Sequence, residues 1–304
     1  MILHHYAFSP FGEKIRGMFG ATGLQWRSVI VPPQPPRPSL APLISGYRKS
    51  PIAQIGADLY CDTRAISDEI ARRTARPELS PLSLSDEERT YQEHVEGPIF
   101  FACLTAIPKT RMLWKLVTTL GWSLPRFVMD RARLGAAGGV DAPSAAKAAE
   151  SWQAHLADLN QRVARGYLGG ERPNHLDFAC YHSLWFFELM SGTVVAQGLD
   201  PLARWQRNLR DLGHGQSVAL DAPGALAIAR DSAPLPIDDA GDDPNLGRPV
   251  TVTPTDYGRD ATDGVLVAST ADRWVLARET SACGRVHLHF PRRGFTLTTA
   301  DATP

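Results

Sequence analysis

The sequence lacks three features that would each have indicated a particular class of protein. No run reaches the roughly 18 uninterrupted apolar residues that span a bilayer, and the first residues show no basic segment followed by a long apolar one. We therefore expect no signal peptide, no membrane partner and a cytoplasmic location. Lys and Arg number 32, and so do Asp and Glu, giving a formal charge of zero. Because electrostatic nucleic-acid binders carry a large basic excess, we expect no nucleic-acid partner.

Cysteine is also scarce. The four cysteines lie far apart and form no C-x-x-C pair, which argues against a disulfide framework or a structural zinc site: Cys61, Cys103, Cys180 and Cys283. His287 and His289 would share one face of a strand and could form half of a metal site. No third ligand is evident, so we expect no metal and a packing or surface role for this pair.

What is present indicates a folded chain of more than one unit. Its 304 residues suggest two domains and a small third unit, and 43% hydrophobic residues can form a sizeable core. The patterns predict an α/β domain over residues 1–76, an all-helical domain over residues 83–232 and a small all-β module over residues 245–304.

The N-terminal domain is predicted from alternating strand and helix signals. Residues 2–6 and 26–31 have strand patterns, and Ser9-Pro10 opens a helix between them because Ser is a good N-cap and Pro suits the first helical turn. Residues 32–38 contain five prolines and predict an extended loop. Residues 50–61 read as two strands joined by a tight turn.

The remaining two units differ in pattern. From Ser85 to about Arg230 the periodicity is helical, with a break at residues 135–139 and a new helix from Pro143. A breaker-rich linker, residues 238–244, precedes five short β-type runs. We expect these runs to form a sheet that closes on itself, so that truncation after Asp238 leaves a folded core. Trp274, Phe290 and Phe295 would be apolar anchors, within the module or against the helices.

Two segments could carry chemistry. At the start of the first helix, the Ser9 hydroxyl could donate a hydrogen bond to a ligand thiolate and lower the pKa of that thiol, which is ordinarily near 8.5. The alternative is that Ser9 serves only as an N-cap. Ser50-Pro51 is a site where a cis bond can occur, and Asp62-Thr63 opens the third helix, where exposed N–H groups hold a carboxylate and Asp62 accepts from an ammonium. Here the alternative is a cap and an ordinary trans proline.

Taken in order, these segments resemble the thioredoxin-like N-terminal domain of the glutathione S-transferase family. The resemblance rests on S-P-F-x-x-K-x-R from Ser9, the turn at Ser50-Pro51 and the acid–hydroxyl pair Asp62-Thr63. A fourth match lies in the helical block, where Asn174 and Asp177 resemble the N-cap and N3 acid of the family's conserved helix start.

The resemblance implies roles for individual residues. Ser9 would activate the thiol of glutathione, with Tyr6 as the rival hydroxyl. Phe11 and the backbone of Ser50, before a cis Pro51, would contact glutathione, and Asp62 and Thr63 would hold its γ-glutamyl end.

The sequence also departs from the family. The residue before Pro51 is usually Val or Ile, the loop at residues 32–38 is unusual, and Gly12 stands where redox relatives have a second cysteine, which excludes a dithiol mechanism there.

The resemblance implies an enzyme that conjugates glutathione as co-substrate to an electrophilic small molecule and acts as a homodimer. The alternative is a non-catalytic binding or scaffold protein of the same fold whose function lies in the C-terminal module.

Overall fold

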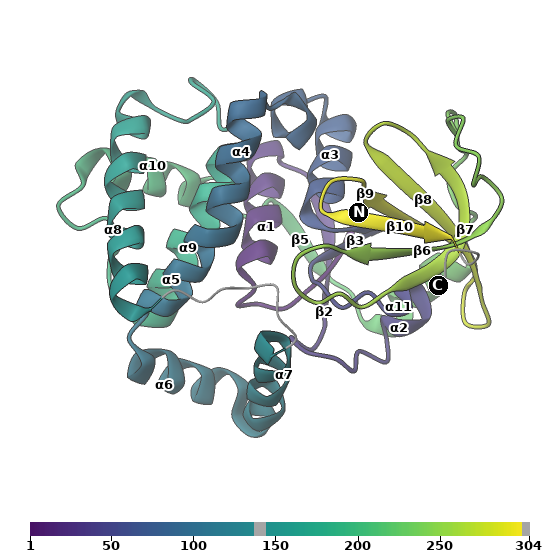
Figure 1. Cartoon of the computed structure of the whole chain (residues 1–304), viewed down its shortest axis with the longest axis horizontal. Helices are drawn as coiled ribbons and strands as arrows, with labels where there is room; N and C mark the ends of the chain where they lie inside the picture. The colour runs from purple at the N-terminus through teal and green to yellow at the C-terminus, as the bar shows by residue number, and fades with distance from the viewer. Residues whose placement is uncertain (137–143, 300–304) are drawn as a thin grey trace.

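The computed structural model describes residues 1–136 and 144–299, which form an α/β domain, a helical domain and a C-terminal set of strands (Figure 1). The break expected at residues 135–139 and the helix start expected at Pro143 therefore lie largely outside the described residues. The helix after them begins at Ala145, with Ser144 as its N-cap.

The predicted elements of the N-terminal domain are present in the predicted order, and one short helix, α2, adds to them between the second and third strands. β1 pairs in parallel with β2 and antiparallel with β3, which pairs antiparallel with β4. This α/β arrangement confirms the expected thioredoxin-like topology. Its elements are β1 (Ile2–His5), α1 (Pro10–Thr22), β2 (Gln25–Ile30), α2 (Ala41–Ile44), β3 (Ile52–Ile55), β4 (Asp58–Cys61) and α3 (Thr63–Thr74).

The middle of the chain is helical, as predicted. Its elements are η1 (Pro77–Leu79), η2 (Pro81–Ser83), α4 (Asp86–His94), the π-helical η3 (Val95–Ile99), α5 (Phe100–Ala106), α6 (Lys109–Leu120), η4 (Gly121–Ser123), α7 (Leu124–Ala136), α8 (Ala145–Arg162), η5 (Val163–Arg165), α9 (His175–Ser191) and α10 (Asp200–Asp211). The helical pattern expected up to Arg230 fails at one point, because β5 (Gln216–Ala219) pairs in parallel with β2, ahead of α11 (Ala222–Arg230).

A buried capping box starts α9 and ties neighbouring segments to it. The Asn174 side chain accepts hydrogen bonds from the backbone of Leu176 and Asp177, and Asp177 accepts from the Asn174 N–H. Asp177 also accepts from the indole N–H of Trp205 at 2.7 Å. The N-cap and N3 roles predicted for Asn174 and Asp177 are confirmed.

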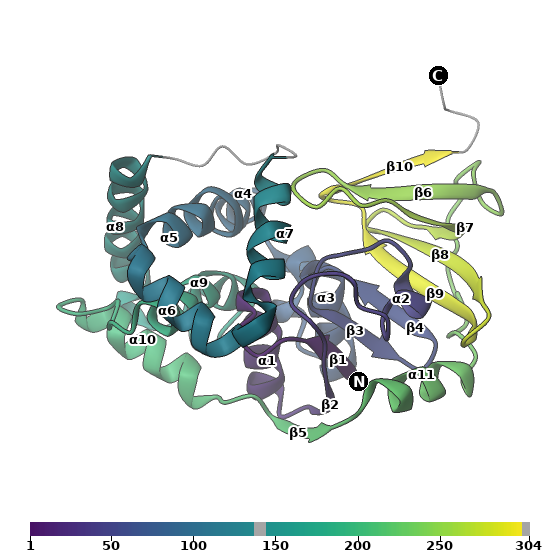
Figure 2. The same cartoon turned by 90° about the horizontal axis from the view of Figure 1, so that it is seen from below.

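The five predicted C-terminal strands are present, but they do not close on themselves. They are β6 (Pro249–Pro254), β7 (Thr262–Ser269), β8 (Arg273–Thr280), β9 (Gly284–Pro291) and β10 (Phe295–Thr299). β9 pairs in parallel with β4, which makes one sheet of ten strands in the order β10-β6-β7-β8-β9-β4-β3-β1-β2-β5. Figure 2 shows this sheet running from β5 past α3 to β10. The expectation of a self-contained module is therefore wrong, because the C-terminal strands are hydrogen-bonded to the sheet of the N-terminal domain and extend it.

Side chains of both units form one apolar cluster at this junction. Leu288 and Phe290 of β9 are buried with Leu59 of β4 and Leu43 of α2. Tyr47 packs edge-on against Phe290, with ring centroids 5.6 Å apart. Phe290 and Phe295 thus anchor the strands against the N-terminal domain and not against the helices. Trp274 belongs to the same cluster.

Candidate functional site

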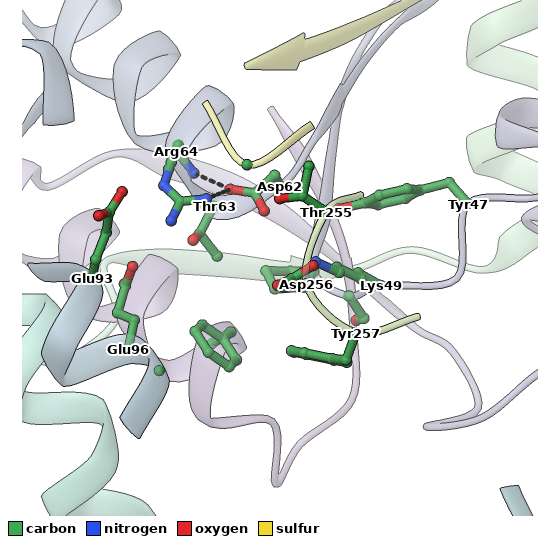
Figure 3. A pocket seen from close by; sticks show the side chains of 15 residues that line it. Tyr47, Lys49, Asp62, Thr63, Arg64, Glu93, Glu96, Thr255, Asp256 and Tyr257 are labelled. Carbon is green, nitrogen blue, oxygen red and sulfur yellow. Dashed lines mark hydrogen bonds and ion pairs between the residues drawn. The ribbon is translucent and has the colours of Figure 1, made fainter. Parts of the chain in front are cut away.

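A cavity of about 250 Å³ opens where the N-terminal domain, the helical domain and the C-terminal strands meet. Figure 3 shows the turn at Asp62 and Thr63 between two opposed walls, one with Glu93 and Glu96 and one with Lys49, Asp256 and Tyr257. The lining residues are Phe11, Tyr47, Lys49, Ser50, Pro51, Asp62, Thr63, Arg64, Glu93, Glu96, Gly97, Thr255, Asp256, Tyr257 and Gly294. The cavity therefore brings together all five residues that the sequence assigned to glutathione binding.

Ser50 and Pro51 lie just before β3. The peptide bond between them is cis, as the resemblance to the glutathione S-transferase family implied. The Ser50 hydroxyl is buried and has no hydrogen-bond partner among the described residues, and neither has the hydroxyl of Tyr47, which is 3% exposed. Two polar groups are thus left at the cavity for a ligand to satisfy, since an unpaired buried hydroxyl costs free energy.

Asp62 and Thr63 form the turn into α3. Asp62 has a φ of 80°, in a region that residues other than glycine rarely adopt. One oxygen of its carboxylate accepts from the Arg64 N–H at 2.9 Å, as an N-cap does. Thr63 is the first residue of the helix, so its N–H has no partner within α3. A carboxylate and helical N–H groups therefore adjoin one another, which suits a ligand end bearing both an ammonium and a carboxylate.

Ser9 has a different position. It is 1% exposed and lines neither this cavity nor the smaller one beside it. Its oxygen accepts from the Gly12 N–H at 3.0 Å, so the N-cap role is present. The proton of its hydroxyl has no acceptor among the described residues. A Cβ at Gly12 would lie 2.9 Å from the Ser9 Cβ, so the close approach of the two residues requires glycine.

Tyr6 lines the smaller cavity. Phe11, Lys49, Ser50 and Tyr257 line both cavities, so the two adjoin each other. Arginines also line the smaller one: Arg37, Arg48 and Arg131. Tyr6 packs on Phe8, with ring centroids 4.8 Å apart. Its phenol is thus closer to a ligand-accessible space than the Ser9 hydroxyl is.

The C-terminal strands supply a wall that the sequence did not predict. Thr255, Asp256 and Tyr257 come from the loop between β6 and β7. The Asp256 carboxylate lies 2.5 Å from the ammonium of Lys49, which also lies 4.7 Å from the centre of the Tyr257 ring. No local pattern could have indicated this meeting, because about 200 residues separate the two partners.

A buried charge network closes the opposite wall. Lys14 of α1 is completely buried, and its ammonium lies 2.5 Å from Glu96 and 3.0 Å from the Nε2 of His175. Burial raises the pKa of Glu96, but the charges of Lys14 and Arg64 outweigh it and lower that pKa to about 2. Burial and Lys14 lower the pKa of His175 to about 3, so its ring is neutral. Lys14 is the lysine of the S-P-F-x-x-K-x-R stretch that begins at Ser9, so this motif could have indicated it as a residue of the site.

His287 and His289 both lie beside the buried carboxylate of Asp58. The Nε2 of His289 donates to this carboxylate at 2.8 Å and its ring stacks on Tyr60, while His287 lies 3.8 Å from the same oxygen. Within residues 1–136 and 144–299, no group of three or more His, Cys, Asp or Glu side chains could hold a metal ion. The pair instead joins β9 to β4.

Comparisons with known proteins support the fold. Residues 3–78 match the model of the glutathione S-transferase N-terminal domain. A crystal structure of a GST-like protein from Pseudomonas syringae matches with a TM-score of 0.78 and 28% identity, over 98% of both chains. The chain has a glutathione S-transferase-like fold.

Two further solved glutathione S-transferases resemble part of this GST-like chain. The enzyme from Rhodospirillum rubrum is 14% identical, with a TM-score of 0.45, over 69% of this chain and 87% of its own. The one from Sinorhizobium meliloti is 16% identical, with a TM-score of 0.46, over the same shares. No curated protein matches the chain. Because the Pseudomonas syringae match spans nearly the whole of both chains, the C-terminal strands belong to the fold that the two GST-like proteins share.

Proposed function

We propose that the protein binds reduced glutathione in this cavity and conjugates it to an electrophilic small molecule. The observation that carries the proposal is the meeting of Ser50, cis-Pro51, Asp62 and Thr63 on one cavity of a GST-like fold. The backbone of Ser50 would pair with the cysteinyl part of glutathione, and Asp62 and Thr63 would hold its γ-glutamyl ammonium and carboxylate. We propose no metal.

The chemical step needs a thiolate. Ser9 stands at the N-terminus of α1, and its free hydroxyl proton would stabilise the thiolate as a hydrogen-bond donor. The thiolate would then attack the electrophilic carbon and form the carbon–sulfur bond as the leaving group departs. We propose the cytoplasm as its location, where glutathione is reduced; the four cysteines are free thiols. A second copy of the chain is the proposed protein partner.

A second candidate is glutathione binding without catalysis. The burial of Ser9 outside both cavities favours it. Thermal unfolding with millimolar reduced glutathione tests the binding that both candidates share. A ligand at 100 times its Kd stabilises by about 2.7 kcal/mol, which raises Tm visibly. Absence of a shift contradicts both; a shift without conjugation of a chlorodinitrobenzene electrophile selects the second.

Substitutions distinguish the candidate hydroxyls. Ser9→Ala should remove most conjugation activity while the free energy of unfolding falls by about 1 kcal/mol through loss of the N-cap. Tyr6→Phe and Tyr257→Phe are matched variants that each delete one phenolic oxygen beside the cavities. Steady-state kinetics of the three variants decide the matter: full activity in Ser9→Ala with loss in either phenylalanine variant transfers the role to that tyrosine.

Asp62→Ala should weaken glutathione binding about 10- to 100-fold, because a hydrogen bond to a charged group contributes about 1.5–3 kcal/mol. The carboxylate is assigned to the remote ammonium of the ligand, so KM for glutathione should rise while kcat is retained. Asp62→Asn keeps an N-cap side chain and isolates the effect of charge. A fall in kcat at constant KM would contradict the assignment.

Asp256→Asn should tighten glutathione binding about two- to fivefold, because the Asp256 carboxylate would no longer compete with the ligand for the ammonium of Lys49. This range corresponds to the free energy of an exposed ion pair. Lys49 would then be free for the glycyl carboxylate of the ligand. Asp260→Asn is the matched control, because Asp260 lies in the same loop but faces Arg48 at 3.6 Å and does not line the cavity. Titration calorimetry measures both, and equal affinities in the two variants would exclude competition for Lys49.

A further inference from the structure

The segment from α6 through η4 to α7, here called the arm, exposes an unusual amount of apolar surface. No residue of α6 is buried, and Trp122 in η4 is fully exposed. Of the eleven large hydrophobic side chains exposed in residues 1–136 and 144–299, six belong to the arm: Leu113, Trp114, Val117, Trp122, Val128 and Met129. Exposed apolar side chains that are concentrated in one segment mark an interaction surface more often than ones scattered singly over the surface.

The arm is fixed on its other side. Met112 and Leu116 of α6 pack against the main core. On α7, Asp130 forms an ion pair with Arg48 at 2.6 Å, and Arg131 donates to the Pro33 carbonyl at 3.1 Å. Figure 1 shows α6 and α7 at the margin of the molecule, below the other helices. The exposed side chains are thus presented from an anchored element.

The charge of the arm differs from that of the rest of the chain. It contains six cations and one acid, a formal charge of +5: Lys109, Arg111, Lys115, Arg126, Arg131 and Arg133 against Asp130. The whole chain is neutral, so the remainder carries −5. Among the described ion pairs, the arm takes part in one alone, Asp130 with Arg48. The five cations of the arm other than Arg131, which binds Pro33, are therefore left for an external anion.

We propose that the arm binds an anionic lipid surface. Helices that lie in the membrane interface combine Lys and Arg with exposed Trp and Leu, because the aromatic rings enter the headgroup region while the cations attract anionic lipid. A second copy docked on this patch would place +5 against +5, which disfavours it. No described helix is long and apolar enough to cross a membrane. The proposal departs from the expectation of no membrane partner, which rested on the lack of such a stretch in the sequence. Peripheral binding to a membrane surface requires no membrane-spanning helix.

Flotation of the full chain with phosphatidylcholine vesicles, with and without phosphatidylserine, tests the proposal. We expect binding only when phosphatidylserine is present, and loss of binding at high salt. Trp114→Ser combined with Trp122→Ser should abolish it. Lys109→Gln combined with Arg111→Gln should weaken it about 25-fold, roughly fivefold per cation. Val194→Ser removes an equally exposed side chain outside the arm and should leave binding unchanged.

Three outcomes would overturn the proposal. The first is no binding to phosphatidylserine vesicles by a folded protein. The second is equal binding to neutral vesicles or by the double tryptophan variant. The third is self-association of the chain that the double tryptophan variant loses, which assigns the arm to a second copy. An unchanged Tm in every variant serves as the check on folding, so the result does not depend on the function proposed for the cavity.

Discussion

A chain ending at Asp238 should be insoluble or should melt far below the full-length protein. The cut removes β6 to β10 and leaves β4 as an open edge, because β9 is its partner. It also exposes apolar side chains of the N-terminal domain, among them Leu43, Ile52 and Leu59, which are now completely buried beside β9. Burial of each side chain contributes about 1.5–3 kcal/mol. Exposure of several would therefore remove a large part of a total free energy of unfolding of about 5–15 kcal/mol.

Solubility, circular dichroism and Tm of the shortened chain check this. Leu288→Ala in the full-length chain is a graded control, since it removes one contact of β9 at a cost of about 2–5 kcal/mol and keeps the ladder. A shortened protein melting within a few degrees of full length would show that the shared cluster contributes little.

Mild acid should unfold the protein, with a midpoint between about pH 5 and 6. Seven buried histidines have lowered pKa values, in each case mainly through burial. The pKa falls to about 4 for His4, His155 and His182 and to about 3 for His5 and His175, and it is also lowered for the two histidines of β9. Unfolded histidine titrates near 6.5, so below that pH the unfolded chain binds more protons than the folded one. The free energy of unfolding therefore falls with falling pH, by about 1.4 kcal/mol per histidine and pH unit, or roughly 7 kcal/mol at pH 5.5 for the five whose pKa falls to about 3 or 4.

His182 provides the sharpest variant for that experiment. It is completely buried against Phe11 and Phe100, and neither ring nitrogen has a hydrogen-bond partner among the described residues. His182→Leu should shift the acid midpoint to lower pH, whereas His94→Leu, at an exposed position, should not. Fluorescence followed at fixed temperature measures the midpoint. A Tm that stays constant from pH 7 to pH 5 would mean that these rings protonate without unfolding.

Features set by local physics could be predicted from the sequence. The N-cap at Ser9 and the capping box at Asn174 depend on neighbouring residues, and both are present. The cis bond before Pro51, which the resemblance to the family implied, is present too. The five C-terminal strands were also visible in the pattern of alternating residues and turns.

Features that join distant segments could not. β5 is a short strand of two polar and two apolar residues, all four exposed, so it has no alternation of apolar and polar residues that would predict a strand. β9 pairs with β4 because apolar side chains of the two strands pack in one cluster. The strands lie far apart in the sequence, and no pattern in either one indicates the other as its partner. Asp62 and Thr63 could be predicted as site residues because they belong to a local sequence motif. Lys49, Asp256 and Tyr257 could not, because they belong to none. Those three meet only because the C-terminal loop returns to the cavity.

The parallel pairing of β4 with β9 also bears on how the chain acquires its structure during synthesis. Asp58 and His289, which hydrogen-bond across these strands, are 231 residues apart. At roughly 5–20 residues per second, a ribosome takes on the order of 10–50 s to deliver the second partner after the first. Contacts of such sequence separation close slowly, and an unpaired strand edge is prone to aggregate meanwhile. The nascent α/β domain therefore needs protection, by a chaperone or by a transient neighbour, until its own C-terminal strands arrive.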